Sequence, residues 1–67
     1  MRTLELSEVN LDEAESTIKR FLANNQYRLP ICIDVTDCES YMPVIVRQLE
    51  NSDFRFYVKD NDVIIIE

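Results

Sequence analysis

The chain has 67 residues, 46% of them apolar and 30% charged, which is typical of a folded globular protein rather than a disordered one. Thirteen acidic residues against seven basic ones give a net charge of −6, so binding to a phosphate backbone would need a local basic patch. With no membrane-length apolar run, no secretory signal and two cysteines, we expect one cytoplasmic domain over residues 1–67, small enough to gain from oligomerisation.

The first predicted elements are a strand and a helix. Residues 3–7 alternate between apolar and polar side chains, as in a half-buried strand. Asn10 precedes the helix and Glu13 follows three residues later, a spacing that resembles a capping box. The apolar stripe of the helix, at helical spacing, consists of Leu11, Ala14, Ile18, Phe21 and Leu22. Asn24 and Asn25 are expected to end the helix.

A second strand and a second helix follow. In the strand over residues 31–36, one set of alternating side chains is expected in the core (Ile31, Ile33 and Val35) and the other outward (Cys32, Asp34 and Thr36). The helix is expected to begin at Ser40, because Pro43 then lies in its first turn, where the missing N–H costs nothing. A cap at Thr36 with Glu39 is the alternative, and it would place Pro43 inside the helix. The buried stripe of this helix is Met42, Ile45, Val46 and Leu49.

The last two predicted strands form a hairpin. In the third strand, core side chains (Phe54, Phe56 and Val58) alternate with outward ones (Arg55, Tyr57 and Lys59). Asp60 and Asn61 tolerate positive φ and are expected to make the tight turn. The unbroken apolar run over residues 63–66 is typical of an interior strand.

The element order β-α-β-α-β-β predicts a two-layer α/β (α+β) sandwich. Right-handed crossovers place both helices on one face of a mixed four-stranded sheet. The most apolar strand, the fourth, is expected between the second and third, so the predicted strand order is 1-2-4-3. The other face of the sheet is left uncovered.

That uncovered face is the first candidate site. Its expected side chains are Thr3, Glu5, Ser7, Cys32, Asp34, Thr36, Arg55, Tyr57 and Lys59, with either Val63 and Ile65 or Ile64 and Ile66. Acids gather on one side and bases on the other. A solvated face is the simpler interpretation, whereas aliphatic side chains exposed beside Tyr57 indicate a docking surface or a homodimer interface.

The acidic loop before the second helix is the second candidate. Asp34, Asp37 and Glu39 carry the oxygen ligands that hard cations prefer, but without an EF-hand pattern or a glycine we interpret them as a solvated loop. Cys38 has no base or histidine nearby and is interpreted as a passive loop cysteine. The sequence therefore predicts no metal and no cofactor.

The element order, together with the segment Asp37-Cys38-Glu39-Ser40-Tyr41-Met42-Pro43, resembles the TusA/SirA-like sulfur carriers. In those proteins an acidic loop and a proline precede or open the second helix, and Smr domains and the C-terminal domain of translation initiation factor three share the architecture. The family's Cys-Pro-x-Pro motif is absent, since Leu11 to Ala14 occupy its place. The histidine and glycine of Smr nucleases are also missing. The resemblance thus implies the fold without the family's active residues.

These observations predict a non-enzymatic module that binds a protein partner, or a second copy, through the uncovered face and the loop over residues 36–40. The candidate binding residues are Asp34, Thr36, Asp37, Cys38, Glu39, Arg55, Tyr57 and Lys59. One alternative is a divergent sulfur-relay protein that uses Cys38. Another is RNA or ribosome binding, which requires Arg47, Arg55 and Lys59 to converge. Nucleic acid is the disfavoured partner, and no membrane contact is expected.

Overall fold

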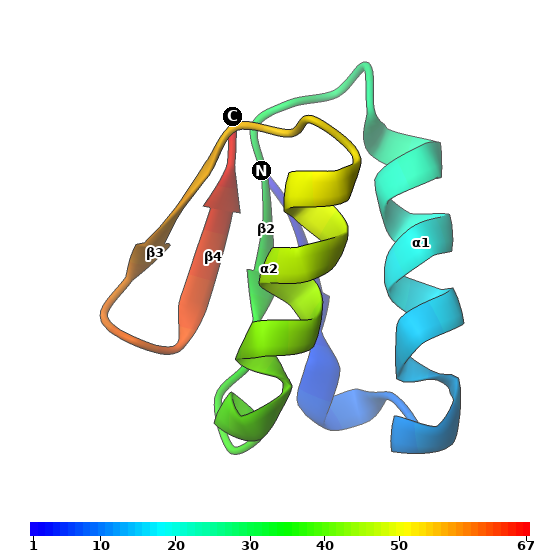
Figure 1. The fold of residues 1–67 in the computed structure, drawn as a ribbon, viewed down its shortest axis with the longest axis vertical. Coiled ribbons are helices and arrows are strands. Elements are labelled where there is room, and N and C mark those ends of the chain that lie inside the picture. Colours follow the sequence, from blue (N-terminus) through cyan, green and yellow to red (C-terminus); the bar gives the residue numbers. More distant parts are fainter.

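The computed structural model describes residues 1–67 and confirms the predicted two-layer sandwich. Its strands and helices, in chain order, are β1 (Arg2–Glu5), α1 (Ala14–Asn25), β2 (Ile31–Asp34), α2 (Met42–Asn51), β3 (Phe56–Lys59) and β4 (Val63–Ile66). The sheet has the order β1-β2-β4-β3, with β1 parallel to β2 and β4 antiparallel to both of its neighbours. Both helices lie against the same side of this sheet (Figure 1). Neither helix combines the length and apolarity that crossing a bilayer requires.

The strand register determines which side chains enter the core between the sheet and the helices. Ile31 is paired with Ile66 and Ile33 with Ile64, so these four side chains share the helix-facing side. Residues that are completely shielded from solvent in this core are Leu6, Ala14, Ile18, Ile31, Ile33, Val35, Ile45, Leu49, Ile64 and Ile66. Because burying one such aliphatic side chain contributes about 1.5–3 kcal/mol, this layer is the main source of stability.

α2 begins two residues later than the predicted start at Ser40, but Pro43 lies in its first turn as predicted. A 3-10 turn over Glu39–Tyr41 leads into the α-helix at Met42, which places Pro43 in the first turn. The alternative cap is not formed, because Cys38 rather than Thr36 precedes the 3-10 turn and no side chain caps that turn.

The first strand is shorter than predicted, and so is the first helix. Residues Leu6–Glu8 form a 3-10 turn, so Ser7 is not part of the sheet and not part of its open face. The turn still brings Leu6 fully into the core. A second 3-10 turn over Leu11–Glu13, capped by the Asn10 side chain on the Asp12 N–H, precedes α1. This turn moves Leu11 off the helical stripe, and its side chain is exposed rather than buried.

For two side chains, alternation predicts the correct face of the sheet but the wrong exposure to solvent. Val58 lies on the helix-facing side of β3, yet it is 44% exposed, because β3 is an edge strand that the helices do not reach (Figure 1). Cys32 faces the open side, as expected, but it is only 7% exposed. Its neighbours on β1 and β4 shield it, and its Sγ donates to Thr3 Oγ1 at 3.3 Å.

The tight turns of this glycine-free chain are made by aspartate and asparagine. Positive φ angles occur at Asp37, Asp53, Asp60 and Asn61, which confirms the predicted turn between β3 and β4. These two residue types tolerate the left-handed region best among those with a side chain.

Candidate functional site

The open sheet face carries two rows of side chains that run across the four strands. One row is Thr3, Cys32, Ile65 and Tyr57, and the other is Glu5, Asp34, Val63 and Lys59, each in the order β1, β2, β4, β3. The register therefore shows which of the two aliphatic pairs of β4 belongs to the open face. Val63 and Ile65 face outward, while Ile64 and Ile66 belong to the core.

The first row is apolar at its centre, and the second row, which has Asp34 and Val63 at its centre, carries opposite charges at its two ends. Cys32 and Ile65 are closely packed by their neighbours, whereas Tyr57 is 48% exposed beside them. Glu5 on β1 and Lys59 on β3 are both exposed, at opposite edges of the same row. Alternation predicted that acids and bases lie on opposite sides of this face. The acidic side is the β1 edge of the sheet, and the basic side is the β3 edge.

A hydrogen-bonded cluster of carboxylates lies where β2 ends. Asp34 Oδ1 accepts from the Thr36 hydroxyl at 2.6 Å and from the Thr36 N–H at 2.9 Å. These two bonds, the hydroxyl bond foremost, hold the pKa of the Asp34 carboxyl below its usual value. Asp62 joins the cluster, with Oδ2 at 3.2 Å from the same hydroxyl and its carbonyl accepting from the Val35 N–H at 2.7 Å.

The loop that follows the cluster is held by its own backbone. Asp37 has a φ of 66° and donates its N–H to Glu39 Oε1 at 3.3 Å. The Cys38 N–H donates to the Val35 carbonyl at 2.7 Å, and the residue is partly buried against the core. Of the predicted loop residues, Asp37 and Glu39 are therefore exposed, while Cys38 packs inward. Both cysteines are free thiols.

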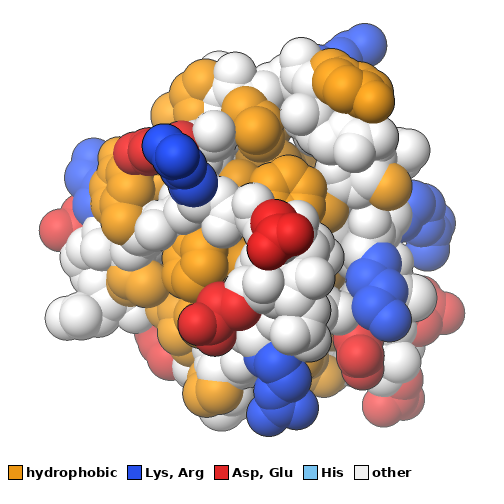
Figure 2. Space-filling view, turned by 45° about the horizontal axis from the view of Figure 1, so that its top comes forward, with side chains coloured by type: hydrophobic (Ala, Val, Ile, Leu, Met, Phe, Trp, Pro, Cys, Tyr) orange, Lys and Arg blue, Asp and Glu red, His pale blue; other side chains and the backbone are white.

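The predicted basic residues do not form one patch. Arg55 was predicted within the third strand but lies just before β3, whereas Lys59 is the last residue of β3, so the two are at opposite ends of the strand. Arg47 is exposed on α2, in the helix layer, whereas Lys59 belongs to the open face of the sheet. On the helix side, Figure 2 shows acidic and basic side chains scattered, with apolar side chains exposed between them. The helix side therefore lacks the separation of charge that the open face has.

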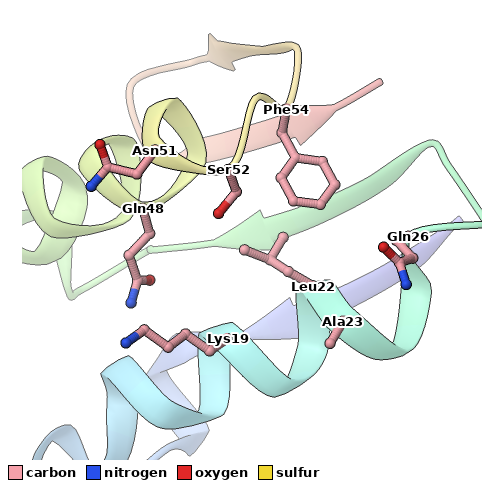
Figure 3. Close-up of a pocket in the computed structure, with 8 residues that line it drawn as sticks. All are labelled: Lys19, Leu22, Ala23, Gln26, Gln48, Asn51, Ser52 and Phe54. Atoms are coloured by element: carbon pink, nitrogen blue, oxygen red, sulfur yellow. The ribbon is translucent and has the colours of Figure 1, made fainter.

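A groove between the two helices is a feature that sequence analysis did not find. It encloses about 480 Å³ between the C-terminal half of α1 and the end of α2 (Figure 3), and its lining is Lys19, Leu22, Ala23, Gln26, Gln48, Asn51, Ser52 and Phe54. Gln48 reaches from α2 toward α1, where Nε2 donates to the Glu15 carbonyl at 3.4 Å and Oε1 is buried without a partner. Lys19 is the one charged side chain of the lining, so the groove offers volume without converging charges.

Comparison of the chain with protein-family models, with curated proteins and with solved structures finds no match. The resemblance to TusA/SirA-like sulfur carriers therefore remains a prediction from element order and the position of Pro43. The candidate site is defined by geometry, as the open sheet face with the loop over residues 36–40 at its end.

Proposed function

We propose that this chain is a non-enzymatic interaction module that binds protein, either a partner or a second copy, through its open sheet face. The observation that carries the proposal is the face itself. The exposed ring of Tyr57 stands on β3 beside the packed side chains of Cys32 and Ile65, and the neighbouring row has an acidic end at Glu5 and a basic end at Lys59. Protein interfaces combine these parts, since an aromatic anchor supplies affinity and charges around it set orientation.

The loop over residues 36–40 extends this surface at the end of β2. Asp34 and Thr36 connect the two, because the Thr36 hydroxyl and N–H both donate to the carboxylate that stands on the open face. Asp37 and Glu39 add exposed negative charge to the same end of the molecule. A partner that covers the face and reaches this end would carry lysine or arginine there.

The two alternative functions have less support from the geometry. A sulfur relay through Cys38 needs a thiol that a second protein can reach, and this residue is partly buried against the core. Absence of a persulfide on Cys38 after incubation with a cysteine desulfurase would eliminate that function. RNA binding needs basic residues on one surface, but Arg47 lies in the helix layer and Lys59 on the open face. RNA retention that is absent, or independent of salt, would eliminate it.

The experiment that tests the proposal compares two tyrosine variants. Tyr57→Ser removes the exposed ring from the open face, and Tyr27→Ser removes a ring that is 92% exposed in the connection after α1. Immobilised protein is used to capture binding proteins from native lysate, and sedimentation velocity follows self-association over a concentration series. We expect Tyr57→Ser to weaken binding while Tyr27→Ser leaves it intact. Equal binding by both variants, or no protein bound by the wild type in either assay, would overturn the proposal.

A further inference from the structure

We propose that the occupant of the open face is a second copy of this chain, packed face to face about a twofold axis that runs parallel to the strands. This inference rests on the proposed function, whose binding surface it uses, and it specifies the partner and its orientation. It is carried by the order of side chains within the two rows of the open face.

Rotation about an axis parallel to the strands reverses each row across the sheet and keeps its level along the strands. The row Glu5, Asp34, Val63, Lys59 then meets its own reverse, so Glu5 of each copy lies opposite Lys59 of the other, and Asp34 lies opposite Val63. The Asp34 carboxylate keeps the two hydrogen bonds that it accepts from Thr36 of its own chain. The dimer therefore contains this pair of opposite charges twice, once at each edge. A twofold interface has to be self-complementary in this way, because the same patch contributes to both sides.

The apolar row is complementary under the same rotation. Cys32 of one copy lies opposite Ile65 of the other, and Thr3 lies opposite Tyr57. The Tyr57 ring, which is 48% exposed in the single chain, is thereby covered. Two sheets packed in this aligned fashion keep their strands within about 30° of each other, which preserves these pairings near the axis.

The other face-to-face twofold axis, which runs across the strands, is unfavourable. It would place β1 and β2 of one copy on β1 and β2 of the other. Glu5 and Asp34 of both chains would then gather at one edge, and the two Lys59 side chains at the other. Like charges brought together in an interface are costly, so electrostatics selects the axis parallel to the strands.

The expected interface is small. The open face spans four strands of four residues, and its central side chains Cys32 and Ile65 are already buried in the single chain, so the dimer covers less surface than the ~800 Å² per partner of standard interfaces. We therefore expect a dissociation constant in the micromolar range or weaker.

The test uses charge reversal at the two edges, measured by sedimentation equilibrium from about 10 μM to about 1 mM, a range that spans such affinities. We expect Glu5→Lys and Lys59→Glu each to weaken dimerisation about tenfold or more, because each places two pairs of like charges in the interface. An equimolar mixture of the two variants, and the double variant, should regain the wild-type affinity, since both restore opposite charges at both edges.

Two control variants make the same charge changes in the helix layer. Glu50→Lys and Lys19→Glu alter exposed residues of α2 and α1 and should leave dimerisation close to that of the wild type. Net charge alone predicts a different pattern. Glu5→Lys makes this acidic protein less negative and would strengthen association if general repulsion were the only electrostatic effect.

The outcomes separate this inference from the proposed function. Loss of dimer in each single variant with recovery in the mixture supports the face-to-face pairing. A wild-type dimer that neither reversal weakens, or that the mixture does not restore, overturns this pairing but not binding through the face. A wild type that stays monomeric at the highest concentration also overturns it, and the Tyr57→Ser capture assay then decides the proposed function independently.

Discussion

Replacing Gln48 with methionine is expected to stabilise the protein. Gln48 Oε1 is buried between the helices without a hydrogen bond, and Nε2 makes only one long bond, 3.4 Å, to the Glu15 carbonyl. An unpaired buried acceptor costs about 1–3 kcal/mol, whereas a neutral hydrogen bond contributes about 0.5–1.5 kcal/mol and a long one falls at the low end. Methionine has a similar length and helix propensity. The free energy of unfolding should therefore rise by about 1 kcal/mol.

Thermal unfolding followed by circular dichroism measures this change. For a domain of this size, about 1 kcal/mol corresponds to an increase in Tm of about 4–8 °C. Gln26→Met is the matched control, because Gln26 lines the same groove but is exposed, and its effect should stay within about 0.5 kcal/mol. A Gln48→Met protein with a lower Tm than the wild type would show that Oε1 has a partner in solution and would refute its assignment as an unpaired acceptor.

Further substitutions test the core, the carboxylate cluster and the turn. Ile64→Ala should cost about 2–5 kcal/mol in urea unfolding and Val58→Ala much less, and equal losses would contradict the edge position of β3. Thr36→Val should raise the pKa of Asp34, measured by NMR titration of its carboxyl carbon. Because this pKa is lower in the folded than in the unfolded state, Asp34 contributes stability above the unfolded pKa that is lost as pH falls through the folded one, and Thr36→Val should reduce that loss. Asn61→Gly should be at least as stable as the wild type and Asn61→Ala about 1 kcal/mol less stable, whereas equal Tm values would argue against the positive φ.

Alternation and helical spacing were sufficient to predict the fold because they report directly on the helix-facing side of the sheet. The unbroken run Val63–Ile66 placed β4 inside the sheet, and Pro43 fixed the first turn of α2. The proline signal depends on local covalent chemistry, and the apolar run depends on burial of the whole strand. Neither signal depends on how far the helix layer extends over the sheet.

The errors have a common physical origin in tertiary contacts. Val58 has the alternation of a core residue, but its exposure depends on whether a helix reaches the edge strand. Leu11 has helical spacing, yet a 3-10 turn rotates it away from the stripe. Asp62 joins the Asp34 cluster only because the turn after β3 places its carboxylate beside Thr36. Neither alternation nor helical spacing in the sequence predicts these tertiary contacts.

The composition of β4 links the fold to the proposed dimer. An antiparallel strand with one solvated face usually alternates between apolar and polar side chains, and an unbroken apolar strand is typical of a sheet covered on both faces. Here the helices cover one face only, which accounts for Ile64 and Ile66 but not for Val63 and Ile65. Side chains of the flanking strands pack around Ile65, which is only 9% exposed, whereas Val63 is partly buried and Tyr57 beside them is 48% exposed. In the proposed dimer a second copy would cover Val63 and Tyr57, and β4 would then be an interior strand with a layer on each face, as its unbroken apolar sequence predicts.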